Sequence, residues 1–392
     1  MSFHYLSCLF YLSTHPNSRG IGGICCLMRN WICETDILRG LQTTSKKPRR
    51  GIMSKPRILY LPTPSHTRLV FLPDTFENFI RSFDVKVNSK ESNYTTEQVA
   101  QEIENYEGLV TGWGTPPLDG SVFERAKKLK IIAHSAGSVK FMLSKEVVSK
   151  YVVPRGICVF SANEAIAYNV AESTIGYMIM ASRRFMEHAL AVRLKKAWRE
   201  PSIPWNGQFL SGSNVGIVGA SKVGRQVIRL LKPFDTRIFV YDPYLSELDA
   251  EALGVKKVGL DDVFSKCDII TIHAPSTEET FHMVGEKQFA LMKDGALLIN
   301  TSRGSVIDHR ALLAKCREGK IRVVLDVTDP EPLPPDSPLR ELENVIITPH
   351  ISGAGYYGYY KIGSSTLQAL LDFFAGRKVS GEVSFQNYDA LA

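Results

Sequence analysis

The sequence predicts an α/β protein in which a doubly wound parallel sheet forms the larger domain. Three observations predict it. Short apolar runs alternate with helical patterns through the second half of the chain, these runs are continuously apolar, and a glycine-containing loop joins the first run to a helix. Continuous apolar strands between helices indicate a parallel sheet that is covered on both faces. The strands are expected at residues 215–219, 237–242, 268–273, 296–302, 322–327 and 345–350.

The chain of 392 residues is long for one core, so two domains are expected. Residues 53–162 are predicted to form the first part of a smaller βα domain, with a helix at 97–106 and strands at 57–62, 108–113, 130–136 and 157–162. Residues 163–350 are predicted to form the larger domain. It begins with a long helix over 163–198, capped by Asn163, and a turn-rich connector over 199–213. A last helical pattern at 366–376 indicates that residues 351–392 return to the smaller domain.

The net charge of +7 is concentrated at the start of the chain. Residues 1–52 hold seven Lys and Arg residues against two acids, which leaves the rest near neutral. We therefore expect no nucleic-acid partner. No stretch approaches about 20 consecutive apolar residues, so no membrane span is expected. The seven cysteines show no paired C-x-x-C spacing, which predicts no metal site and a reducing compartment.

Three interpretations of residues 1–52 stay open: an upstream extension that is not translated, a disordered extension, or a targeting peptide. Arg and Ser with few acids are typical of a mitochondrial presequence, but the segment has no clear amphipathic period. Met53 opens MSKPRILYLP, which resembles a natural protein start. We expect a cytoplasmic protein, or a mitochondrial one if the leader is a real presequence.

The loop VGIVGASKVG at residues 215–224 fits the dinucleotide-binding spacing G-x-G-x-x-G at Gly219 and Gly224, with Ser221 in the central position. A strand precedes it and a helical pattern follows, so helix N-terminal N–H groups would face a pyrophosphate. The next strand ends at Asp242, where an acid accepts hydrogen bonds from the adenosine ribose. An acid there repels the extra phosphate of NADP, so NAD is the expected cofactor. The simpler alternative is an ordinary strand–turn–helix.

Polar residues follow later strands, at the edge where open α/β sheets bind ligands. Arg303 has the planar fork that suits a substrate carboxylate. His350 can exchange a proton with a carbonyl oxygen, and Glu331 can orient its ring. Asp326 is better placed for the nicotinamide carboxamide. Each residue alone would be an ordinary surface or structural group, but together they predict hydride transfer to a 2-oxoacid.

These motifs resemble the D-isomer-specific 2-hydroxyacid dehydrogenase family over about residues 56–385. They are VGIVGASKVGR, VYDP, HAPSTEET, INTSRGSVID, LDVTDPEPLP and TPHISGA. The resemblance implies a Rossmann coenzyme domain inserted in a flavodoxin-like substrate domain, and a homodimer. It places the family's catalytic triad on Arg303, Glu331 and His350. It implies cofactor contacts at Gly219, Ser221, Lys222, Val223, Gly224, Asp242, Ala274, Pro275, Thr280, Thr301, Ser302, Arg303, Asp326 and His350.

The substrate side departs from the family pattern. The loop IIAHSAGSVKFM has Ser138 and Lys140 where the family usually has a glycine-rich, acidic sequence, and GYYGYYK follows His350. We expect Trp113, Ala136, Gly137 and Ser138 to contact substrate with Arg303. The expected substrate is glyoxylate, hydroxypyruvate or a bulkier 2-oxoacid. The alternatives are an NADH-sensing scaffold of the corepressor kind, and an inactive paralogue that binds only the cofactor.

Overall fold

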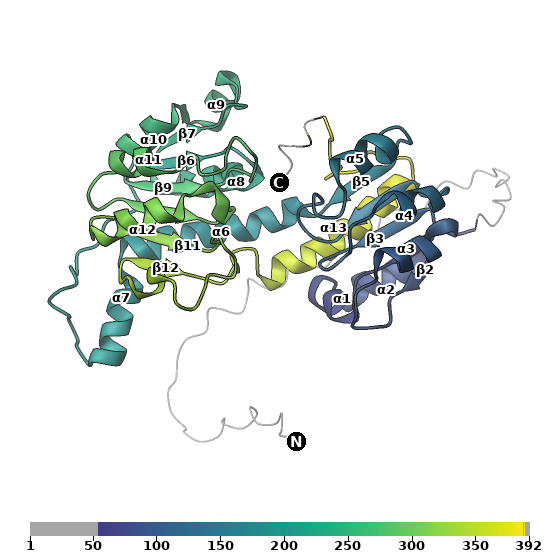
Figure 1. Cartoon of the computed structure of the whole chain (residues 1–392), viewed down its shortest axis with the longest axis horizontal. Helices are drawn as coiled ribbons and strands as arrows, with labels where there is room; N and C mark the ends of the chain where they lie inside the picture. Colours follow the sequence, from purple (N-terminus) through teal and green to yellow (C-terminus); the bar gives the residue numbers. More distant parts are fainter. Residues whose placement is uncertain (1–53, 387, 389–392) are drawn as a thin grey trace, which may run out of the picture. The chain divides into compact units, whose positions relative to one another are not determined.

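The computed structural model describes residues 54–386 and residue 388. The predictions for the leader, residues 1–52, lie outside the described residues. The described chain forms two parallel sheets, and the predicted α/β class is confirmed (Figure 1). No helix in this part of the chain is long and apolar enough to span a membrane.

The first sheet has five parallel strands in the order β2-β1-β3-β4-β5. This is the flavodoxin-like order, as expected. Helices on one face contribute Val99, Val122 and Val147 to its core, and those on the other contribute Val70, Phe79 and Leu370. The strands are β1 (Arg57–Tyr60), β2 (Asp84–Val87), β3 (Gly108–Thr111), β4 (Ile131–His134) and β5 (Cys158–Ser161), and the helices are α1 (Pro64–Val70), α2 (Pro73–Ser82), α3 (Thr96–Glu102), α4 (Gly120–Arg125), α5 (Lys145–Val147) and α13 (Tyr356–Phe374).

Helix α13 begins at Tyr356, whereas the apolar pattern predicted a start at residue 366. The earlier turns contain glycines, which lower helix propensity, so they did not look helical. Packing explains these glycines. A Cβ on Gly363 would lie 2.2 Å from the carbonyl oxygen of Val70, and one on Gly358 would lie 2.1 Å from the side chain of Asn169. Close approach of neighbouring elements therefore outweighs the intrinsic cost of glycine in this helix.

The second sheet has seven parallel strands in the order β12-β11-β10-β9-β6-β7-β8. From β6 the chain continues to β7 and β8 on one side of that strand and then crosses to β9 on its other side. The strand order therefore reverses beside β6. Ligands bind at the carboxyl ends of strands at such a point. The strands are β6 (Asn214–Val218), β7 (Arg237–Tyr241), β8 (Lys256–Lys257), β9 (Ile269–Ile272), β10 (Leu297–Asn300), β11 (Arg322–Leu325) and β12 (Val345–Ile347).

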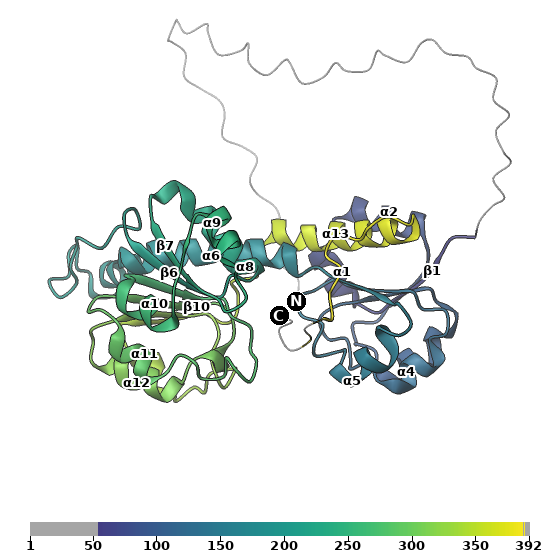
Figure 2. The same ribbon diagram turned by 90° about the horizontal axis from the view of Figure 1, so that it is seen from above.

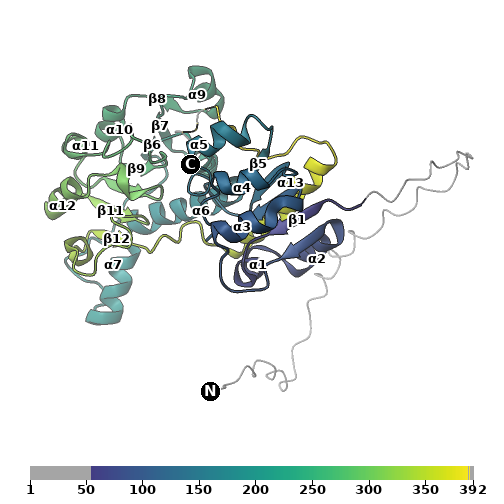
Figure 3. The same ribbon diagram turned by 45° about the vertical axis from the view of Figure 1, so that its right-hand side comes forward.

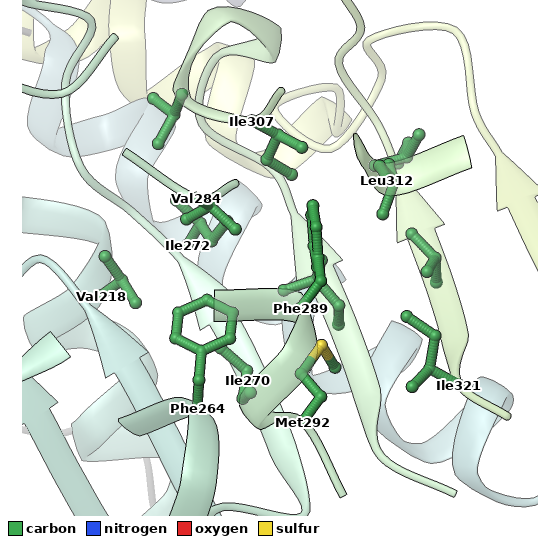
Figure 4. Close-up of a cluster of buried hydrophobic side chains, with 14 of the residues drawn as sticks. Val218, Phe264, Ile270, Ile272, Val284, Phe289, Met292, Ile307, Leu312 and Ile321 are labelled. Atoms are coloured by element: carbon green, nitrogen blue, oxygen red, sulfur yellow. The ribbon is translucent and has the colours of Figure 1, made fainter. Parts of the chain in front are cut away.

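Helices cover both faces of this sheet, as the continuous apolar strands predicted. On one face lie α10 (Leu260–Lys266), α11 (Glu286–Leu291) and α12 (His309–Arg317), in a row in Figure 3. Phe264 of α10 and Phe289 of α11 lie in one buried cluster with side chains of the sheet, among them Ile270 of β9 (Figure 4). Each such side chain contributes roughly 1.5–3 kcal/mol through burial. On the other face lie α6 (Asn163–Ser182), α8 (Lys222–Leu231) and α9 (Glu247–Leu253) (Figure 2).

The predicted single helix over 163–198 is wrong in two details. Helix α6 ends at Ser182, and a short helix, α7 (Phe185–Leu190), follows after Arg184 takes a left-handed conformation at φ 54°. The carbonyl of Ser182 accepts a hydrogen bond from the Gln208 N–H, which replaces a helical bond there. At the other end, Asn163 is the first helical residue and not the cap. Its N–H donates to the Ser161 hydroxyl at 3.2 Å.

Candidate functional site

The glycine loop between β6 and α8 requires both of its glycines. Gly219 has φ 97°, and a Cβ there would lie 2.8 Å from the amide nitrogen of Ala274. A Cβ on Gly224 would lie 2.1 Å from the carbonyl oxygen of Gly219. The loop is thus tight against its own helix and against the end of β9. Such a turn leaves helix N-terminal N–H groups open to an anion, so these residues fit the pyrophosphate of a dinucleotide.

Ser221 has a structural role that explains why the central glycine is dispensable. It is the N-cap of α8, and its hydroxyl accepts from the Gly224 N–H at 3.4 Å. Its backbone is extended, so the position does not demand glycine. Lys222 is the exposed first residue of the helix, and Val223 packs against the core below the loop.

Asp242 lies at the end of β7, next to the same loop. One carboxylate oxygen accepts from the Ala220 N–H at 2.7 Å and the other from the Tyr244 N–H at 2.8 Å. These bonds fix the carboxylate beside the glycine turn. Each oxygen keeps further acceptor capacity. The arrangement fits an acid that receives hydrogen bonds from ribose hydroxyls.

Gly224→Ala is expected to weaken NADH binding at least about ten-fold and to lower the melting temperature, because the new methyl group displaces the loop that it supports. Gly176→Ala is the matched control, since a Cβ there meets nothing within 4 Å. Fluorescence titration with NADH measures the first effect and thermal unfolding the second. Equal NADH affinity in the two variants would contradict the proposed role of the loop.

The residues after β9 and β10 form the next part of this edge. Ala274 is buried, and the Thr280 hydroxyl donates to the Pro275 carbonyl at 2.7 Å. Thr301 is buried with its hydroxyl 3.3 Å from that of Thr174 in α6, and Ser302 is held by Asn300 at 2.8 Å. These residues therefore lie together at the carboxyl ends of adjacent strands, as predicted.

Arg303 follows directly, at the start of a short 3₁₀ turn. Its backbone carbonyl accepts from the Asn300 side chain at 2.9 Å, and its own guanidinium donates to the Ser302 carbonyl at 2.7 Å. Although Arg303 reaches solvent, desolvation lowers the pKa of its guanidinium, and the carboxylate of Glu331 opposes this shift. Arg303 and Glu331 thus act on each other electrostatically.

His350 and Glu331 form a direct pair. The ring Nδ1 of His350 lies 2.6 Å from Oε1 of Glu331, and both side chains are about half exposed. His350 has φ 54°, a left-handed conformation that is uncommon outside glycine. The structure therefore pairs a carboxylate directly with an imidazole. The guanidinium of Arg303, which the sequence predicted to act with them, is connected to this pair through its electrostatic interaction with Glu331.

Asp326 is buried and accepts three hydrogen bonds through its carboxylate. They come from the Thr348 hydroxyl at 2.6 Å, the Ile351 N–H at 2.9 Å and the Ser352 N–H at 2.8 Å. Its backbone carbonyl also accepts from the His350 N–H at 2.9 Å. Asp326 thus anchors the loop that carries His350, a role that the sequence did not indicate.

A cavity of about 690 Å³ lies beside His350 and Glu331, and Arg303 is not among the residues that line it. Its wall includes Glu331, His350 and Asp326, together with the apolar side chains of Leu333, Val345 and Ile347. Half-exposed acid–base groups at the wall of a pocket of this size are typical of a small-molecule site.

The predicted substrate-side residues lie at the carboxyl edge of the five-stranded sheet. Trp113 packs against His66 and Tyr359, with ring centroids 5.0 and 5.7 Å apart. Ala136 is buried, and the Gly137 carbonyl accepts from the Ser161 hydroxyl at 2.5 Å. The Ser138 hydroxyl accepts from the Lys140 N–H at 3.3 Å.

Sequence analysis missed His66 in this region. Its ring lies 2.9 Å from the Ser135 hydroxyl, and burial lowers the pKa of His66 to about 4. His66 lies inside α1, beyond the end of β1, so a rule based on strand ends does not select it.

Three comparisons show which known proteins this chain resembles. The family model of the D-isomer specific 2-hydroxyacid dehydrogenase, NAD binding domain, matches residues 175–352. A glyoxylate reductase of Korarchaeum cryptofilum is 34% identical over 300 residues, which cover 75% of this chain and 87% of that protein. A D-3-phosphoglycerate dehydrogenase of Archaeoglobus fulgidus is 30% identical over 313 residues, which cover 80% of this chain but 58% of that longer protein.

The solved structure of a phosphoglycerate oxidoreductase from Rhizobium etli has a TM-score of 0.71 and 26% identity, and the match covers 84% of this chain and 99% of that one. The resemblance inferred from the motifs is confirmed. The matched domain binds NAD(H), which is the expected cofactor. The chain belongs to the D-isomer-specific 2-hydroxyacid dehydrogenase family.

Proposed function

We propose that this protein is an NAD-dependent oxidoreductase that interconverts a D-2-hydroxyacid and its 2-oxoacid. The observation that carries the proposal is the pair between His350 Nδ1 and Glu331 Oε1 at 2.6 Å, at the ligand-binding edge of a dinucleotide fold. Arg303 follows β10 at the same edge of the sheet. An imidazole backed by a carboxylate is a general acid–base group. A guanidinium close by is suited to hold the carboxylate of a 2-oxoacid.

The division of roles follows from the geometry. The Nδ1–H of His350 donates a hydrogen bond to the Glu331 carboxylate, so Nε2 is the nitrogen that exchanges a proton with substrate. In the reductive direction His350 delivers that proton to the carbonyl oxygen, and the Glu331 carboxylate stabilises the imidazolium. Arg303 holds the substrate carboxylate through its fork of donors. The chemistry that bound NADH supplies is a hydride for the carbonyl carbon.

The cofactor site in this proposal extends along the strand ends already described. The glycine loop and the N-terminus of α8 bind the pyrophosphate, and Asp242 binds the adenosine ribose. The remaining contacts come from Ser221, Lys222, Val223, Ala274, Pro275, Thr280, Thr301, Ser302, Arg303, Asp326 and His350.

Asp242→Ala is expected to weaken NADH binding by roughly ten- to a hundred-fold, because charge-assisted bonds to the ribose are lost. The affinity for NADPH should change less, so the ratio of the NADPH and NADH dissociation constants should be smaller than in the wild type. Asp249→Ala, an exposed acid in the first turn of α9, is the control. Titration of both variants with both cofactors measures the change. If the ratio of the two dissociation constants is the same as in the wild type, Asp242 does not bind the ribose.

The substrate proposed is glyoxylate, hydroxypyruvate or a bulkier 2-oxoacid. Trp113, Gly137 and Ser138 contact it from the smaller domain, which comprises residues 53–162 and 351–392, while residues 163–350 form the coenzyme domain. Ala136, also predicted to contact substrate, has no exposed surface and is left out of the proposed site. The test is NADH oxidation by protein that starts at Met53, with 2-oxoacids of increasing size and NADPH as the control cofactor. Turnover of any of them supports the proposal. NADH binding without turnover of any would overturn it.

A cytoplasmic location is also proposed. Cys158, Cys267 and Cys316, the cysteines in the described part of the chain, are buried and free. Burial raises the pKa of each thiol to about 12, so they are poor nucleophiles. Free cysteines fit a reducing compartment.

One segment with exposed apolar side chains supports the homodimer that the family resemblance implies. Between Phe185 and Phe209 the chain exposes Leu194 at 68%, Trp198 at 85% and Trp205 at 71%. Large apolar side chains gathered in one exposed segment mark an interaction surface. This segment is therefore the proposed contact with a second copy.

Leu194→Asp is expected to convert the dimer to a monomer, because it places a charge in the apolar contact. The matched control is Leu248→Asp, which changes a leucine that is 76% exposed on α9. Light scattering after size-exclusion chromatography gives the mass of each variant. A wild-type monomer, or an unchanged dimer in Leu194→Asp, would contradict the proposed surface.

A further inference from the structure

The loop that carries His350 is held by residues of two different elements. Asp326 holds it from the sheet, as described above. From helix α6, the hydroxyl of Tyr177 lies 3.0 Å from the hydroxyl of Thr348, and the Ser352 hydroxyl donates to Tyr177 at 3.4 Å. Tyr177 therefore contacts the loop two residues before and two residues after His350.

The direction of these hydrogen bonds can be assigned. An ionised carboxylate can only accept hydrogen bonds. The Thr348 hydroxyl therefore donates its proton to Asp326, at an oxygen–oxygen distance of 2.6 Å. Thr348 must then accept from Tyr177, whose hydroxyl in turn accepts from Ser352. The chain of donors runs from Ser352 through Tyr177 and Thr348 to Asp326. The Ser352 N–H also donates to Asp326 at 2.8 Å, which closes the chain into a ring.

The ring surrounds a strained residue. His350 has φ 54°, and a side chain in this conformation persists when its surroundings hold it there. The ring fixes Thr348 and Ser352, so the strained backbone between them has little freedom. That backbone sets the direction of the imidazole toward Glu331.

We infer that Tyr177 is a positioning residue: its hydroxyl bridges Thr348 and Ser352 and holds the His350 loop in the conformation that pairs the imidazole with Glu331. The catalytic consequence rests on the role proposed for His350. The structural consequence, a more weakly held loop without the hydroxyl, does not.

The variant that tests it is Tyr177→Phe, which removes one oxygen and keeps the ring. The matched control is Tyr168→Phe on the same helix. Tyr168 contacts Arg229 and Lys361 through its ring, which phenylalanine retains. We expect Tyr177→Phe to lower kcat by roughly three- to ten-fold, the value of one hydrogen bond, with the Kd for NADH unchanged. Tyr168→Phe should match the wild type.

Two measurements show whether a lower kcat of Tyr177→Phe comes from a misplaced His350 or from a smaller fraction of folded protein. Using NADH that carries deuterium at the transferred position, the isotope effect on kcat should rise in Tyr177→Phe, because a misplaced His350 slows the chemical step. Loss of active molecules would leave the isotope effect unchanged. Hydrogen exchange of the Ile351 and Ser352 amides should also be faster in Tyr177→Phe than in Tyr168→Phe, whether or not the enzyme turns over.

Faster amide exchange with a raised isotope effect supports the inference. Equal exchange in the two variants overturns it, as does a lower kcat with an unchanged isotope effect. If the wild type turns over no 2-oxoacid, the proposed function fails. In that case the hydrogen-exchange rates of the Ile351 and Ser352 amides still decide whether Tyr177 holds the loop.

Discussion

His350→Asn is expected to lower kcat by roughly 10²- to 10⁴-fold, the usual contribution of a general acid–base group. Asparagine tolerates the left-handed backbone at this position, so the loop should keep its conformation. It cannot deliver a proton to the carbonyl oxygen. NADH affinity should stay within about two-fold of the wild type, because charge-assisted cofactor contacts are retained elsewhere in the site. Steady-state kinetics and NADH titration measure both quantities.

The chain offers a close control for this variant. His282 also has a positive φ, at 51°, and is exposed outside the proposed triad. His282→Asn should therefore leave kcat near the wild-type value. If His350→Asn keeps more than about a tenth of the wild-type kcat, a group other than His350 supplies the proton.

Arg303→Gln is expected to lower kcat/KM for the 2-oxoacid by roughly 10²- to 10³-fold, because two charge-assisted hydrogen bonds to the substrate carboxylate are lost. Arg303→Lys should recover part of this loss, since lysine keeps the charge but not the planar fork. The measurement is kcat/KM for one good 2-oxoacid substrate with each variant.

Arg310→Gln, at an exposed position in the first turn of α12, is the control for the change in charge. An equal loss in Arg303→Gln and Arg310→Gln would mean that general electrostatics, and not a carboxylate clamp, accounts for the effect. A loss that appears only in NADH affinity would assign Arg303 to the cofactor alone.

Much of the larger domain could be predicted because its signals are local. Parallel strands that are buried on both faces are continuously apolar, and the glycine loop must follow the first of them. Strand ends lie at one edge of such a sheet, so Arg303 and His350 could be assigned to one site from their positions after strands. Asp242 was found by the same rule.

Other features depend on contacts between distant parts of the chain. The anchoring of the His350 loop joins Asp326 and Tyr177 to residues 348–352, and no local pattern shows it. The end of α6 depends on a bond between Ser182 and Gln208. The early turns of α13 contain glycines because neighbouring elements approach closely. In each case tertiary packing outweighs local propensity.

The central claim is that this chain transfers a hydride from NADH to the carbonyl carbon of a 2-oxoacid. The most direct test incubates the wild type with a 2-oxoacid and NADH that carries deuterium at the transferred position, and examines the product by mass spectrometry. The account predicts a 2-hydroxyacid that carries one deuterium at C2. With hydroxypyruvate or a bulkier 2-oxoacid, chiral chromatography of the product should show the D configuration. Unlabelled product, or no 2-hydroxyacid from any 2-oxoacid tried, would contradict it.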